Sequence, residues 1–134
     1  GDIQGHVKYE KSALDADRAA RIARKLQTAM ERDEVFRDPN LSLMSLSQHV
    51  GVSTNYVSQS LNEHLGVSFF DFVNGSRVEA SKSMIIAGAK PISVIAYEVG
   101  FNSRSSFYTA FKKNTGMTPS EFGTTGDATV AMIT

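Results

Sequence analysis

The sequence contains no cysteine, and only three of its 134 residues are proline. The absence of cysteine excludes a disulfide framework, a thiolate zinc site and a cysteine nucleophile, and it is compatible with a reducing compartment. No apolar run approaches the roughly 18 residues of a membrane-spanning helix, and no signal peptide is visible. We therefore expect a cytoplasmic domain that makes no membrane contact of its own, with membrane anchoring of a parent protein left open.

The chain also lacks an excess of charge of either sign, because 14 basic residues balance 14 acidic ones. A basic surface is the usual signature of nucleic-acid binding, so the total charge counts mildly against that function. The acids lie mainly outside residues 91–122, for example at positions 15, 17, 31, 33 and 34, and residues 91–122 carry three basic residues and two acids. Screening acts over about 10 Å, so the local sign matters more than the total.

Helical periodicity interrupted by glycine and proline predicts an all-α chain without strands. Residues 13–36 are predicted to form the first helix, because Leu14, Ile22 and Leu26 fall near one face. Residues 1–11 and 123–134 have no such period and are expected to be loose tails. The sequence begins Gly-Asp rather than Met, so we expect a fragment of a larger protein.

Serine and glycine mark the boundaries of the later helices, since serine caps helix starts and glycine ends helices in the left-handed conformation. We predict helices over 43–50 between Ser42 and Gly51, 54–64 between Ser53 and Gly66, 69–87 between Ser68 and Gly88, 91–99 from Pro91 to Gly100, and 104–115 between Ser103 and Gly116, then a turn from Pro119 to Phe122.

The sequence also repeats itself at an offset of 50 residues. The offset aligns Ser53 with Ser103 and Leu61 with Phe111. Each copy reads helix, glycine turn, capped helix, glycine, which is the helix-turn-helix pattern. The repeat predicts helix-turn-helix units at 42–66 and 91–116, joined by a linker helix at 69–87 within a domain spanning 12–122. An all-α bundle with a duplicated hairpin is the alternative.

The second helix of the second unit has the layout of a DNA-recognition helix. Its period turns Phe107, Ala110 and Phe111 inward. The opposite face is polar and holds no acid; arginine can bridge guanine N7 and O6, hydroxyls can bond base edges or phosphates, and lysines suit phosphates. The candidate DNA-binding residues here are Arg104, Ser105, Tyr108, Thr109, Lys112 and Lys113.

The corresponding helix of the first unit repeats this layout, with Val57, Ser60 and Leu61 turned inward. Asn and Gln side chains on its outer face match adenine N6 and N7. The candidates here are Thr54, Asn55, Ser58, Gln59 and Asn62. Because this helix has no Lys or Arg, it should contribute less electrostatic affinity than the second. For both helices, a solvated outer face is the alternative.

The predicted linker helix at 69–87 sets a length scale. Its 19 residues span roughly 28 Å at about 1.5 Å each, whereas successive major grooves on one side of a duplex lie about 34 Å apart. We expect recognition in neighbouring grooves with some DNA bending. Gly75 lies inside this helix and costs up to about 1 kcal/mol relative to Ala; close helix packing is one explanation.

Residues 91–122 contain the motifs I-A-x-x-V-G-F, S-x-F, F-K-K and G-x-T-P-x-E-F, and the linker contains Asn74, Arg77 and Ala80. Mainly through these motifs, residues 41–122 resemble the AraC/XylS family of bacterial transcription regulators. The resemblance implies seven helices and two helix-turn-helix units. It also implies binding to double-stranded promoter DNA, usually activation through RNA polymerase, and a separate sensor or dimerisation domain.

The resemblance also carries base-contacting roles onto individual residues. These are Asn55, Ser58 and Gln59 in the first unit, and Arg104, Ser105, Tyr108 and Thr109 in the second. The chain departs from the family pattern in its first recognition helix, where Leu61 replaces a frequent Phe and basic residues are absent.

Two other classes of function are weaker. The histidines at 6, 49 and 64 lack metal-binding spacing, and no G-x-S-x-G elbow or phosphate loop occurs, so we expect no enzymatic activity, metal or cofactor. An apolar stripe could instead bind a protein partner, although core packing is favoured at this spacing; it comprises Phe69, Phe70, Phe72, Met84 and Ile85. Steep salt dependence would distinguish DNA binding from such an interface.

Overall fold

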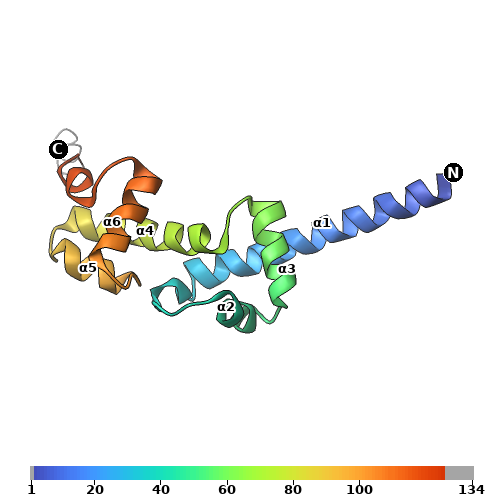
Figure 1. Cartoon of the computed structure of the whole chain (residues 1–134), viewed down its shortest axis with the longest axis horizontal. Helices are drawn as coiled ribbons and strands as arrows, with labels where there is room; N and C mark the ends of the chain where they lie inside the picture. Colours follow the sequence, from blue (N-terminus) through green and yellow to red (C-terminus); the bar gives the residue numbers. More distant parts are fainter. Residues whose placement is uncertain (1, 126–134) are drawn as a thin grey trace. The chain divides into compact units, whose positions relative to one another are not determined.

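The computed structural model describes residues 2–125, which form helices and turns without a strand (Figure 1). Within that range there are seven α-helical segments, so the all-α prediction is confirmed. The chain divides into two compact units. Unit 1 is Gly1–Val35 with Leu41–Phe72, and unit 2 is Phe36–Asn40 with Val73–Thr134. Each unit contains one helix-turn-helix pair.

Unit 1 contains helix α1 (Asp2–Glu31) and the pair α2 (Leu43–Val50) and α3 (Thr54–Gln59). α3 continues directly as the π-helical segment η2 (Ser60–Leu65). Ser42 and Ser53 cap α2 and α3 as predicted, and Gly51 and Gly66 end the helices in the left-handed conformation at φ 73° and 68°. The π geometry was not predicted.

Unit 2 contains α5 (Ile92–Glu98), α6 (Arg104–Thr115), a last helical segment at 119–125 and most of α4 (Phe69–Ala87) and of the 3₁₀ turn η1 (Val35–Arg37). The first residues of η1 and of α4 belong to unit 1. Ser68 accepts the Asp71 backbone N–H at the start of α4, and Ser103 caps α6. Pro91 lies at the N-cap of α5, just before the predicted position.

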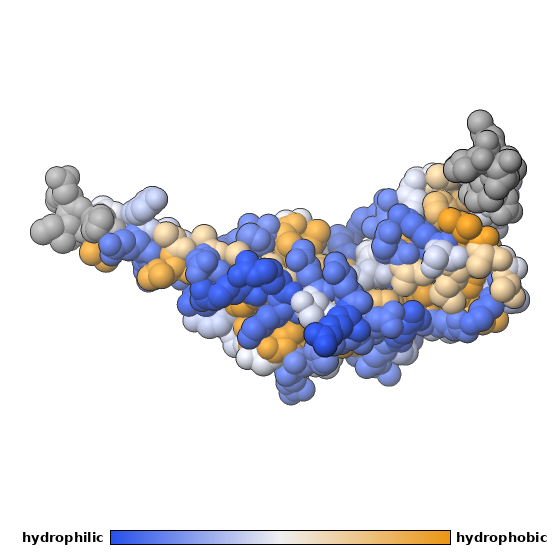
Figure 2. Space-filling view, turned by 180° about the vertical axis from the view of Figure 1, so that it is seen from behind, coloured by the Kyte–Doolittle hydropathy of each residue, from blue (hydrophilic) through white to orange (hydrophobic). Residues whose placement is uncertain are grey.

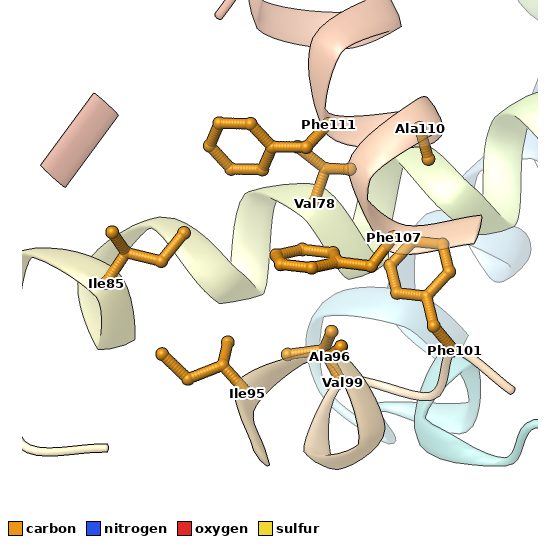
Figure 3. Packing of buried hydrophobic residues seen from close by; sticks show 9 residues of the cluster. All are labelled: Val78, Ile85, Ile95, Ala96, Val99, Phe101, Phe107, Ala110 and Phe111. Carbon is orange, nitrogen blue, oxygen red and sulfur yellow. The ribbon is translucent and has the colours of Figure 1, made fainter. Parts of the chain in front are cut away.

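Each unit has a core beneath its helix-turn-helix pair. In unit 1, Leu26, Leu46 and Leu61 are at most 1% exposed and come from α1, α2 and η2. In unit 2, Phe107 points into the space between α4 and α5, and Phe111 extends over Val78 (Figure 3). The Phe107 and Phe111 rings meet edge to face at 5.7 Å between centroids, a favoured geometry for buried aromatic pairs. These contacts set the orientation of α6.

The first helix differs from its prediction at both ends. It begins at Asp2 instead of residue 13 and ends at Glu31 instead of 36, so the expectation of a loose start was wrong. Leu14, which was predicted to face inward, is 69% exposed, and Val7 and Tyr9 are also exposed. Figure 2 shows apolar atoms scattered among hydrophilic ones along this helix. An exposed extension has no buried stripe to reveal it, but adding residues to an existing helix avoids the nucleation cost.

Three other expectations also need correction. Residues 123–125 are helical rather than loose, whereas the rest of the expected C-terminal tail lies outside the described residues. In the apolar stripe, Ile85 belongs to the core, but Phe70 is 73% exposed. A Cβ atom on Gly75 would lie 3.8 Å from Asn114 Oδ1, an ordinary contact, so close packing does not explain this glycine.

Candidate nucleic-acid interface

The outer face of α6 is polar and accessible, as its sequence predicted. Phe107, Ala110 and Phe111 are buried beneath it. Arg104, Ser105, Thr109, Lys112 and Lys113 are exposed. The two lysines lie in the last turn, where the helix dipole stabilises positive charge. This face therefore combines hydrogen-bonding groups near the helix start with charge near its end.

Tyr108 is the one candidate in α6 that is not fully outward. Its ring is half-buried and packs against the core cluster. Arg104 Nη2 donates to the Tyr108 hydroxyl at 3.2 Å, and the Arg104 guanidinium lies 5.2 Å from the ring centroid. The hydrogen bond from Arg104 lowers the pKa of Tyr108, with a smaller contribution from Ser120, while burial opposes the shift.

The Arg104–Tyr108 contact leaves arginine able to bind a base. A guanidinium has five N–H donors, and this hydrogen bond uses one of them. Two parallel donors are enough to bridge guanine N7 and O6. The Tyr108 hydroxyl, a half-buried group, accepts a hydrogen bond from Arg104 on the outer face of α6. Base contact by Tyr108 stays a prediction.

The first recognition helix, α3 with η2, presents a smaller accessible polar face. Val57, Ser60 and Leu61 are buried as predicted. Only Asn55 and Asn62 among the candidates are exposed; Thr54, Ser58 and Gln59 are half-buried. The Gln59 amide also donates to Glu63 Oε2 at 3.0 Å. This hydrogen bond uses one of the two N–H donors of the Gln59 amide and leaves its oxygen free.

Helix α1 supports the first recognition helix through contacts that sequence reasoning missed. The Ser60 hydroxyl donates to the Ala19 carbonyl at 2.7 Å. The Arg18 guanidinium lies 4.2 Å from the centroid of the Tyr56 ring, and it pairs with Asp15 at 2.8 Å. The ion pair of Arg18 and Asp15 thus lies beside a helix that has no lysine or arginine. The contact between Arg18 and Tyr56 could not be predicted from a local sequence pattern, because the two residues are 38 positions apart.

The flank of η2 next to α1 carries acidic groups. A surface hollow of about 450 Å³ lies there, and its lining includes Asp15, Gln59, Glu63 and His64. Of the two carboxylates, Asp15 pairs with Arg18, and Glu63 accepts a hydrogen bond from Gln59.

Other functional groups are few in the part of the chain that the structure describes. No group of three or more metal-ligating side chains occurs within it. His49 instead pairs with Asp33 at 2.9 Å. None of the helices described is long and apolar enough to cross a membrane.

Two helix pairs, in each of which a serine caps the second helix and that helix has a buried inner face and a polar outer face, define a double helix-turn-helix protein. Residues 46–125 match the family model described as a helix-turn-helix domain. The chain belongs to the AraC-type family of helix-turn-helix transcriptional regulators.

Individual relatives agree with this assignment. An uncharacterized HTH-type transcriptional regulator of Staphylococcus aureus is 35% identical over 98 residues, covering 73% of this chain and 13% of that protein. The arabinose operon regulatory protein of Escherichia coli is 33% identical over 85 residues, covering 63% of this chain and 29% of that protein. The chain thus spans less than a third of either relative.

Solved structures show the same fold. The C-terminal domain of AraT, a response regulator from Geobacillus stearothermophilus, has a TM-score of 0.67 at 30% identity, over 78% of this chain and 84% of that one. The C-terminal domain of the two-component response regulator yesN from Fusobacterium nucleatum has a TM-score of 0.63 at 28% identity, over 73% and 93%.

Proposed function

We propose that this chain binds promoter DNA sequence-specifically, with α6 and the α3–η2 helix entering successive major grooves. The outer face of α6 carries the proposal, because Arg104, Ser105 and Thr109 are exposed there with no acid among them. These residue types supply the donors and acceptors that major-groove edges require. The five exposed or half-buried polar candidates of α3–η2 form the second, weaker contact.

The two recognition helices should contribute unequally to the affinity for DNA. α6 supplies one arginine and two lysines, whereas the residues of α3 and η2 include Glu63 and no lysine or arginine. Electrostatic contact with phosphates supplies most non-specific affinity. We therefore assign most of the affinity to α6 and a largely hydrogen-bonded contribution to Asn55 and Asn62.

Use of neighbouring grooves is supported by the length of α4. Its 19 residues correspond to roughly 28 Å of helix, somewhat below the ~34 Å between successive major grooves. Bending the duplex toward the protein shortens that separation, so we propose that DNA is bent in the complex. Bending would add sequence preference at base pairs that no side chain touches.

The wider role follows from the relatives. We propose that this domain forms part of a larger cytoplasmic regulator in which a sensor or dimerisation domain controls DNA binding, and in which bound protein activates transcription through RNA polymerase. The staphylococcal and arabinose regulators are several times longer than the matched segment, and AraT is named as a response regulator.

Salt dependence tests the DNA-binding proposal against the rival of a protein-interaction domain. We expect the affinity for mixed-sequence duplex DNA to fall linearly with salt on a double logarithmic plot, with a slope near −0.9 for each phosphate neutralised. The double variant Lys112→Gln/Lys113→Gln should flatten that slope, whereas Lys82→Gln, in the linker helix, should not. Absence of DNA binding at low salt would contradict the proposal and favour the rival.

A further inference from the structure

Arg77 in α4 is only 9% exposed, although arginine is seldom buried unless its donors are paired. Its donors are directed mainly at backbone. Nε donates to the Phe36 carbonyl at 2.8 Å and Nη2 to the Asp38 carbonyl at 2.9 Å, while Nη1 donates to Asn74 Oδ1 at 3.2 Å. Burial lowers the pKa of Arg77, and the charge of Asp38 opposes the shift. The Arg77 side chain thus donates hydrogen bonds to two backbone carbonyls of the segment Phe36–Asn40.

That segment, Phe36–Asn40, is held on unit 2 by further contacts. Arg37 Nη1 donates to the Glu98 carbonyl at 3.0 Å, and Phe36 is 4% exposed. Gly100, at φ +108°, lies against it: a Cβ atom there would be 2.3 Å from the Phe36 carbonyl oxygen. Only glycine permits this approach. The α5–α6 turn and α4 therefore form a seat for the segment.

The segment Phe36–Asn40 interrupts unit 1 in the sequence. Phe36–Asn40 belongs to unit 2, yet the chain that precedes it through Val35 and the chain that follows it from Leu41 both belong to unit 1. The backbone therefore passes between the units three times, at 35–36, 40–41 and 72–73. Without the seat, only the passage through α4 would remain. One covalent passage leaves far more relative freedom than three.

We propose that Arg77 is a positioning residue that sets the spacing of bases which the two recognition helices can bind together. This inference rests on the proposed function. Arg77 itself touches no DNA and acts by keeping Phe36–Asn40 seated on unit 2. When two linked contacts are held in one geometry, the second has a high effective concentration only on sites of matching spacing. Loss of the seat should broaden the accepted spacing and weaken binding at the preferred one.

The test compares duplexes in which the two base blocks are separated by the preferred number of base pairs, or by one or two more or fewer. Arg77→Lys keeps the charge but cannot bridge both carbonyls and Asn74 in the same geometry. Arg37→Gln, which removes the exposed bond to Glu98, is a second variant that retains the core. Lys82→Gln is the matched control in the same helix, because Lys82 pairs with exposed Glu79 within that helix.

For the parent chain we expect the preferred spacing to bind at least about tenfold more tightly than altered ones. Arg77→Lys should reduce that ratio to about threefold or less. Its affinity for a duplex that contains only the α6 block should equal that of the parent chain. Arg37→Gln should lower the ratio by a smaller amount. If folded Arg77→Lys keeps the parent ratio, the inference is wrong; should it fail to fold, an unchanged ratio in Arg37→Gln has the same meaning. A parent chain without spacing preference would instead contradict the proposed function.

Discussion

Replacing Arg104 by alanine is the sharpest test of the α6 surface. Arg104 is the only basic residue in the first two turns of α6, and Tyr108 holds its guanidinium at 3.2 Å. A bidentate contact with guanine contributes about 1–3 kcal/mol of discrimination, which corresponds to about 5- to 150-fold in affinity. Arg104→Ala should therefore weaken binding within that range and remove the preference at one base pair.

The assay is a competition titration of the selected duplex against single-base variants of it. Arg104→Lys keeps the charge without the planar fork, so it should retain affinity for mixed DNA and lose the preference for guanine. Tyr108→Phe should cost less than Arg104→Ala, because it frees Arg104 without removing it. A uniform loss across all sequences, with the salt slope reduced by about one, would show a phosphate contact and refute base recognition by Arg104.

The same substitution has a signature without DNA. The hydrogen bond from Arg104 is the main cause that lowers the pKa of Tyr108. In Arg104→Ala this pKa should rise toward the ordinary tyrosine value, so the phenolate absorbance at 295 nm should develop at higher pH than in the parent chain. An unchanged titration would mean that the two side chains do not interact in solution.

Three further predictions concern other parts of the domain. Lys112→Gln should weaken binding to all duplexes alike and reduce the salt slope by about one; a change confined to one base pair would contradict phosphate contact. Gly75→Ala should stabilise the fold by up to about 1 kcal/mol, measured by denaturant unfolding, because its Cβ meets only Asn114 at 3.8 Å; a loss of stability would show a contact that the structure lacks. Ser103→Ala should cost about 1 kcal/mol, since Ser103 Oγ accepts the Ser106 N–H at 3.1 Å. Ser105→Ala, two positions further along in the first turn of α6, is the control and should cost much less.

The sequence predicted most of the helix boundaries and both inner faces because those features depend on nearby residues. Ser53 and Ser103 act within three positions of themselves, and the burial of Phe107 and Phe111 follows from helical period alone. The internal repeat supported the prediction of both helix-turn-helix units, because the same pattern occurs in each of them.

Features that depend on distant partners were not predictable in this way. Tyr108 falls on the polar face by period, but its ring packs against the core. The stacking of Arg18 on Tyr56 joins residues far apart in sequence. Arg77 stood out in the sequence only through the family resemblance, and its carbonyl partners lie about 40 positions away. The Gln59 contact is local, because its partner Glu63 lies four positions away, but the helical period alone did not indicate it.

The central claim is that two recognition helices of one chain bind bases in neighbouring major grooves. Selection of binding sites from a random duplex pool at near-physiological salt tests it most directly. The account predicts two short conserved blocks about one helical turn apart, with a guanine in the block that Arg104→Ala no longer selects. Selection of a single block would contradict base recognition by the first unit, and failure to enrich any sequence would contradict sequence-specific binding by this domain.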